Sequence, residues 1–131
     1  MDIVTRQRIN LLIQLADLRS IKSKSPVASI VKRVARECDF PDNELNQLLK
    51  SPEPIGTFGA LSPNQRAQYV FNLGEVMANI ELDTTKVLMC HKLAYDLGYS
   101  KKHLNTLVAK LQHENNSTSA NKEEVLLRIT A

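Results

Sequence analysis

The sequence predicts an all-α protein, a compact bundle of about six or seven helices. Three observations lead to this class. Apolar residues recur with the period of an α-helix along almost the whole chain, no segment alternates with a period of two, and capping residues precede most of the apolar stretches. The chain has 131 residues, of which 43% are hydrophobic and 24% charged, which is typical of a globular domain and excludes a disordered one. Aromatic residues make up 5% and Trp is absent, which disfavours a β-sandwich or barrel.

Three helices are expected in the first half. The first covers residues 3–18, and the second follows Ser25, a good cap, and Pro26, which suits the first helical position. A short third helix opens after Pro41. The positions expected to face inward are Ile9, Leu12, Ile13 and Ala16 in the first helix, Val27, Ile30, Val31, Val34, Ala35 and Cys38 in the second, and Leu45, Leu48 and Leu49 in the third.

A loop at residues 51–61, rich in Pro and Gly, separates these helices from three more. Ser62 and Gln65 form a capping-box pattern, Asp83 is a cap for the next helix, Gly98 is its stop, and Ser100 caps a third. The expected inward positions are Ala67, Val70, Phe71, Gly74, Met77, Ala78, Val87, Cys90, Ala94, Leu97, Leu104, Leu107, Val108 and Leu111.

The chain partly matches itself after a shift of 59 residues, with pairs such as Ala35 and Ala94 or Phe40 and Tyr99. This predicts two pseudo-repeated three-helix halves, at about residues 3–50 and 62–111, within a domain of residues 1–114. Chance agreement between amphipathic helices is the alternative. Residues 115–131 are expected to be a polar linker and a short amphipathic helix, whose aliphatic residues are Val125, Leu126 and Ile129.

The net charge of +3 is unevenly distributed, with +6 over residues 1–36 and −4 over residues 37–60. A basic loop and the helix after it contain the candidate partner-binding residues, which are Arg19, Lys22, Lys24, Lys32, Arg33 and Arg36. Ordinary solvated surface charge is the alternative. We expect a protein partner with an acidic surface, with an anionic membrane as a second option. Nucleic acid is not favoured because no aromatic residue precedes Phe40. The C-terminal helix could support a homo-oligomer.

We expect a cytoplasmic protein, because neither a signal-peptide pattern nor an apolar run of about 18 residues is present. The two cysteines are then thiols, and their places on apolar stripes predict that both are buried. His91, His103 and His113 lack metal-ligand spacing, and residues 56–59 lack the pattern of a phosphate-binding loop. We therefore expect no enzyme, with a Cys90 and His103 pair as the residual catalytic alternative.

Residues 78–83, with the sequence Ala-Asn-Ile-Glu-Leu-Asp, and residues 90–99 resemble the repeat of the tellurite-resistance TerB-like family. The resemblance covers roughly residues 9–111. It implies an all-helical fold, a link to tellurite or stress resistance, and, in some members, divalent cations bound by acidic residues. It implies no catalytic activity.

Transfer of the family motif leaves few metal ligands. Glu81 and Asp83 match acidic positions, Asn79 replaces an Asp, and Lys86 stands at a later Glu position. Because Ca²⁺ needs about six to eight oxygen ligands, we expect no metal and no cofactor. The sequence therefore predicts a non-catalytic interaction or scaffold domain of the TerB-like type, which contacts an acidic partner through its basic loop. The alternative is a metal-binding tellurite- or stress-resistance protein that holds a divalent cation such as Ca²⁺ or Mg²⁺.

Overall fold

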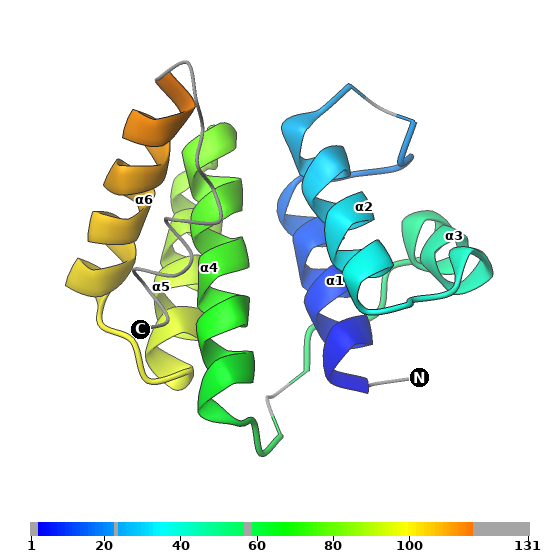
Figure 1. Cartoon of the computed structure of the whole chain (residues 1–131), viewed down its shortest axis with the longest axis horizontal. Coiled ribbons are helices and arrows are strands. Elements are labelled where there is room, and N and C mark those ends of the chain that lie inside the picture. The colour runs from blue at the N-terminus through cyan, green and yellow to red at the C-terminus, as the bar shows by residue number, and fades with distance from the viewer. Residues whose placement is uncertain (1–2, 23, 57–58, 117–131) are drawn as a thin grey trace. The chain divides into compact units, whose positions relative to one another are not determined.

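The computed structural model describes residues 3–22, 24–56 and 59–116, and these form six α-helices and no strand (Figure 1). The all-α class predicted from the sequence is confirmed. The helices are α1 (Ile3–Leu15), α2 (Pro26–Glu37), α3 (Asp42–Lys50), α4 (Pro63–Asn79), α5 (Thr84–Asp96) and α6 (Lys101–Asn116). The chain divides into two units, Met1–Gly59 with α1 to α3 and Ala60–Ala131 with α4 to α6. No helix in the described part of the chain is both long enough and apolar enough to cross a bilayer.

Side-chain caps fix where the helices begin, as the sequence predicts. The Ser25 hydroxyl accepts a hydrogen bond from the Val27 amide at the start of α2. Ser62 and Gln65 form a complete capping box at the start of α4, since each side chain accepts from the backbone amide of the other. These bonds satisfy amides that have no partner within the helix, and each cap contributes about 1 kcal/mol.

The first unit has an aliphatic core on which α1 packs against α2 and α3. The buried aliphatic residues include Ile9, Leu12, Ile13, Val27, Ile30, Val31, Val34, Leu45, Leu48 and Leu49. Two details of α1 differ from the prediction. The helix ends at Leu15 and not at residue 18, because Asp17 adopts a positive φ of 49° and the Leu18 amide bonds to the Ile13 carbonyl. Ala16 is consequently only half-buried.

The loop after α3 is fastened to α1 through Glu53. The Asn10 side chain forms two hydrogen bonds of 2.9 Å with the backbone of Glu53, one to its carbonyl and one from its amide. Gln14 donates to the same carbonyl, and Arg6 forms a 2.7 Å ion pair with the Glu53 carboxylate. Arg6, Asn10 and Gln14 are spaced four residues apart and share one face of α1. The predicted surface loop is therefore tied along that helix.

The second unit is built around a close approach of α4 and α6. Gly74 lies at the contact, and a Cβ at this position would lie 2.7 Å from Cδ2 and 2.9 Å from Cγ of Leu107. Those distances are shorter than normal carbon–carbon contacts, so the absence of a side chain at Gly74 allows the two helices to meet. Helix α5 packs against both of them (Figure 1).

The turns that follow α2 and α5 have the same construction, 59 residues apart. The Phe40 amide donates to the Ala35 carbonyl at 2.8 Å, and the Tyr99 amide donates to the Ala94 carbonyl at 2.8 Å. The residue before each aromatic has a positive φ, 53° at Asp39 and 93° at Gly98. This reversal ends each helix and directs the chain into the next one.

Several positions expected to be inward are more exposed than predicted. Cys38 lies beyond the end of α2 and is exposed, so the prediction of a buried thiol there is wrong. Met77, Ala78, Val87 and Val108 are half-buried.

Helix α6 continues to Asn116, so the predicted linker does not begin at residue 115. The predicted tail helix, residues 120–130, lies outside the described residues.

Candidate interaction surface

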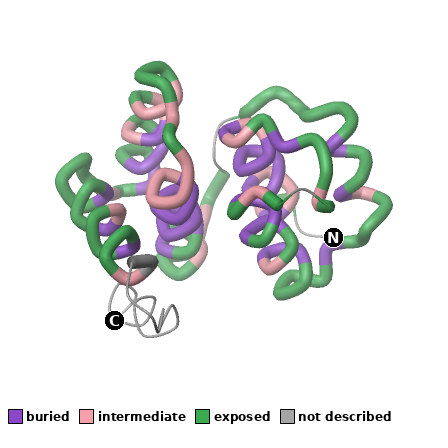
Figure 2. Tube along the Cα trace, turned by 90° about the horizontal axis from the view of Figure 1, so that it is seen from above, coloured by how far each residue is buried: buried purple, intermediate pink, exposed green. Residues whose placement is uncertain are grey.

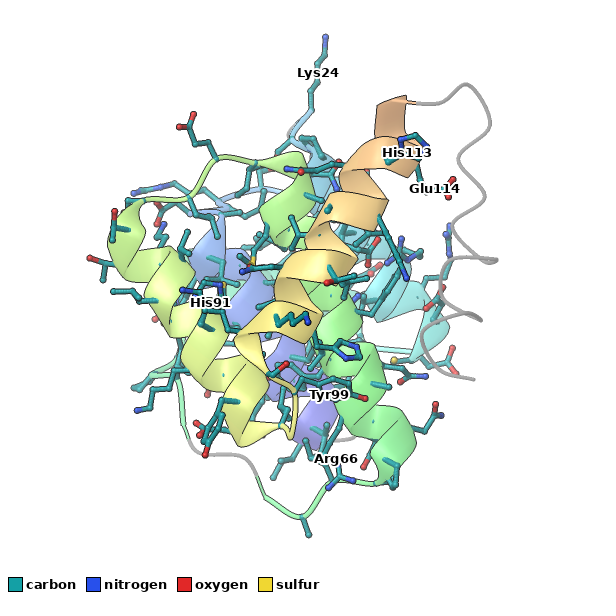
Figure 3. The ribbon with its side chains drawn as sticks, turned by 90° about the vertical axis from the view of Figure 1, so that its left-hand side faces the viewer. Lys24, Arg66, His91, Tyr99, His113 and Glu114 are labelled. Atoms are coloured by element: carbon teal, nitrogen blue, oxygen red, sulfur yellow. The ribbon has the colours of Figure 1, made fainter. Side chains whose placement is uncertain are left out.

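Three of the six predicted partner-binding cations lie on the loop between α1 and α2. Arg19, Lys22 and Lys24 are all exposed. The Ser20 hydroxyl accepts a hydrogen bond of 3.0 Å from the Lys22 amide, which fixes a local turn between the first two of them. Figure 3 shows the Lys24 side chain standing away from the ribbon. We call Arg19, Lys22 and Lys24 the basic loop.

The other three cations lie on α2, where the structure separates them. Lys32 and Arg36 are exposed and are four residues apart, so they share a face of the helix opposite its buried aliphatic stripe. Arg33 is only half-exposed and forms an ion pair of 3.8 Å with Glu37. The predicted exposed face therefore holds for Lys32 and Arg36, while the charge of Arg33 is partly balanced by its neighbour.

The remaining arginines of the first unit have structural partners. Arg6 pairs with Glu53 and, at 3.8 Å, with Glu44. Arg8 is buried and donates a 3.2 Å hydrogen bond to the Cys38 sulfur. By contrast, no carboxylate in the described residues forms an ion pair with the basic loop, Lys32 or Arg36. Within the first unit, the exposed cations that form no such ion pair are therefore those of the basic loop, Lys32, Arg36 and Lys50, and the second unit has exposed lysines of its own.

A groove of about 520 Å³ opens beside the basic loop, at the ends of α1 and α3. Ile13, Leu18 and Leu49 lie in its wall and are themselves at most 7% exposed. Arg19 and Lys50 line it together with the acidic Asp17. Arg19 therefore belongs both to the basic loop and to a concave surface, a combination that residue spacing alone did not show.

The residues matching the TerB-like acidic motif do not fit a bound divalent cation. Asp83 caps α5, where its Oδ1 accepts a 2.8 Å hydrogen bond from the Lys86 amide. The Asn79 side-chain amide donates 2.7 Å to the Glu75 carbonyl, and Glu81 is exposed. The described residues contain no group of three acidic, histidine or cysteine side chains placed to hold a metal. Two carboxylates, one of them used as a helix cap, fall short of the ligands that Ca²⁺ requires.

The two thiols have different environments. Cys90 is fully buried on α5, as predicted, and burial raises the pKa of its thiol from 9.0 to about 11. A nucleophilic cysteine needs the opposite shift, because the thiolate is the reactive form. The exposed Cys38 contacts the guanidinium of Arg8, a contact between residues 30 positions apart that sequence spacing could not show.

The three histidines do not share a site, as Figure 3 illustrates for His91 on α5 and His113 near the end of α6. His91 Nε2 lies 3.2 Å from Asn105 Oδ1, which joins α5 to α6. His103 stacks edge-to-face on Tyr99, with ring centroids 4.9 Å apart. His91 and His103 therefore both have a structural contact. In the alternative pair of Cys90 and His103, the thiol that would act as the nucleophile is buried.

No protein-family model matches the sequence, and neither a curated protein nor a solved structure shows significant similarity to it. The charges and surfaces of the described residues are consequently the basis for a functional proposal.

Proposed function

We propose that the chain is a non-catalytic, TerB-like interaction module that binds an acidic protein surface through its basic loop and the exposed cations of α2. The observation that carries this proposal is the difference between cations within the first unit. Arg6, Arg8 and Arg33 have partners inside the unit, whereas Arg19 on the loop and its two neighbouring lysines project into solvent.

A protein partner is favoured over nucleic acid by the composition of this surface. Single-stranded nucleic acids are usually held by cations together with aromatic rings on which bases stack. The basic loop and α2 contain no aromatic residue. Exposed Lys and Arg without such rings suit carboxylates, with which they form ion pairs that steer association.

Peptide binding measured by fluorescence anisotropy tests the proposal. The probe is a labelled peptide of ten alternating Glu and Ser residues, and the variant is Arg19→Glu/Lys22→Glu/Lys24→Glu. An exposed ion pair contributes ~0.2–1 kcal/mol. Losing three such pairs and adding three repulsions weakens binding by a factor on the order of ten or more.

Lys92→Glu/Lys101→Glu/Lys102→Glu is the matched control, because it makes the same change of charge at three exposed lysines of the second unit. We expect this control to retain most of the affinity. Equal losses in the two triple variants would reject the basic loop as the site. Tighter binding of a 20-base-pair DNA duplex or of phosphatidylserine vesicles than of the peptide would assign the surface to those partners.

A further inference from the structure

The second unit has a groove of about 450 Å³ where α4 turns into α5, with a mainly aliphatic lining that also includes Asn79, Glu81 and Gln112. Its walls come from the last turn of α4, the turn itself, the start of α5 and the middle of α6. The aliphatic residues that line it are Met77, Ala78, Ile80, Leu82, Val87 and Val108, and every one of them is half-buried. Residues 77–80 form one uninterrupted half-buried stretch, and Figure 2 marks stretches of this intermediate class in pink.

The groove residues are more exposed than the helical spacing of the sequence predicts. Met77, Ala78, Val87 and Val108 occupy positions whose helical spacing predicts burial, yet the structure leaves each of them only half-buried. The rest of the second unit follows its pattern closely, since Leu104 and Leu107 are at most 2% exposed. Half-buried aliphatic residues gathered in a groove offer a surface on which an apolar segment can pack.

The length and position of the chain beyond α6 identify that segment. Val108 and Gln112 of α6 line the groove, and Asn116, where the helix ends, is about one helical turn from Gln112, roughly 6 Å along the axis. Fifteen residues follow Asn116 in the sequence. Five of them, residues 117–121, can span up to about 16 Å, enough for the next residues to turn back along α6.

The sequence of the segment suits an apolar groove. Val125, Leu126 and Ile129 share one face at helical spacing, and Lys122 stands one turn before them on that face, whereas Leu127 and Arg128 lie off it. A helix of this length is marginal alone in water, so the aliphatic face needs a surface on which to pack.

We propose that residues 120–130 dock in cis as an amphipathic helix in the groove between α4, α5 and α6, with Leu126 and Ile129 against its aliphatic wall. The first unit carries the proposed partner surface, so this docking is independent of the proposed function.

Limited trypsin digestion of the full chain tests the docking, because Lys122 and Arg128 place cleavage sites inside the segment. Mass spectrometry measures the rate of cleavage after Lys122. Dividing the rate for a synthetic peptide of residues 115–131 by this rate gives a protection factor. Protection reports the fraction of molecules in which the segment is docked.

We expect Leu126→Asp/Ile129→Asp to lower the protection factor by ~10-fold, with each variant compared with a peptide carrying the same changes. Leu82→Asp, on the groove side, is expected to lower it similarly. Ser117→Asp/Ser119→Asp adds the same two charges outside the aliphatic face and should preserve protection. Circular dichroism of each variant shows whether α1 to α6 remain folded.

Three results would overturn the proposal. The first is a protection factor of one in the unsubstituted chain. The second is loss of protection in Leu126→Asp/Ile129→Asp but not in a folded Leu82→Asp, which would place the segment elsewhere. The third is protection that rises with protein concentration together with a dimer in light scattering, which would assign the groove to a second copy.

Discussion

Adding a methyl group at Gly74 tests the packing on which the second unit depends. In Gly74→Ala the new Cβ would lie 2.7 Å and 2.9 Å from two carbons of Leu107, against an ordinary contact of about 3.5–4.0 Å. Leu107 is 2% exposed and surrounded by core, so it can yield only by straining its neighbours. Such overpacking costs about 1–3 kcal/mol, whereas the better helix propensity of Ala returns up to about 1 kcal/mol.

The expected net effect of Gly74→Ala is a loss of about 1–2 kcal/mol in the free energy of unfolding, measured by urea denaturation followed by circular dichroism. Gly59→Ala is the matched control, because a Cβ at Gly59 meets nothing within 4 Å. That substitution should be neutral or stabilise by up to about 1 kcal/mol.

A double-mutant cycle with Leu107→Ala separates the clash from other effects. Leu107→Ala alone removes a buried side chain and should cost about 2–5 kcal/mol. In the double variant the Cβ at position 74 no longer meets a leucine side chain at position 107. The loss of unfolding free energy in the double variant should therefore be smaller than the sum of the losses in the two single variants by about 1–2 kcal/mol. Strict additivity, or a stabilising Gly74→Ala, would refute the close approach of α4 and α6.

Four further predictions concern single side chains. Asn10→Ala should lower the free energy of unfolding by about 2–4 kcal/mol in urea denaturation, because it removes both bonds to the loop backbone, whereas Gln14→Ala should cost about 1 kcal/mol; equal costs would count against the Asn10 anchor. Asp83→Ala should cost about 1 kcal/mol through loss of the α5 cap, whereas Asp83→Asn should lose much less in the same assay. In the folded chain a maleimide should modify the exposed Cys38 much faster than the buried Cys90, and rapid labelling of both would contradict the burial. Because burial raises the pKa of Cys90 to about 11, the unfolded chain loses this proton first, and stability should fall as pH rises from 9 towards 11, less steeply in Cys90→Ala.

The helix boundaries could be predicted because they depend on neighbouring residues. Ser25, Ser62 and Asp83 cap the helices that follow them, through bonds that span only two or three positions. The stop at Gly98 is equally local, since its positive φ suits a residue without a side chain. The same rules missed Asp39, where a non-glycine residue adopts a positive φ at the equivalent turn.

Contacts between distant residues could not be predicted. Periodicity shows which face of a helix is apolar, but not where the neighbouring helix ends. It therefore predicts burial for Met77 and Val87, which the structure leaves half-buried. Cys38 continues the apolar stripe of α2 in the sequence, yet the helix ends before it. The attachment of Glu53 to α1 joins residues 39 to 47 positions apart, and no local pattern marks it.

In the proposed site, too, the features that depend on local sequence could be predicted, and those that depend on distant contacts could not. The uneven distribution of charge along the chain and the helical spacing of residues 26–37 indicate the six cations, and the exposure of Lys22 and Lys24 follows from their place in a polar loop. The ion pair that involves Arg33, and the groove beside Arg19, depend on how the helices pack. Of the six predicted cations, only Arg33 forms an ion pair with a described carboxylate, whereas the basic loop, Lys32 and Arg36 form none.

The salt dependence of acidic-peptide binding tests the central claim most directly. The dissociation constant of the unsubstituted chain for the Glu–Ser peptide is measured at NaCl concentrations from 20 to 300 mM, since exposed charges are screened over a Debye length of about 10 Å at 0.1 M salt. The account predicts affinity that weakens steadily with salt, and a much weaker dependence in the basic-loop triple variant. Absence of binding at the lowest salt, or affinity that salt does not change, would contradict it.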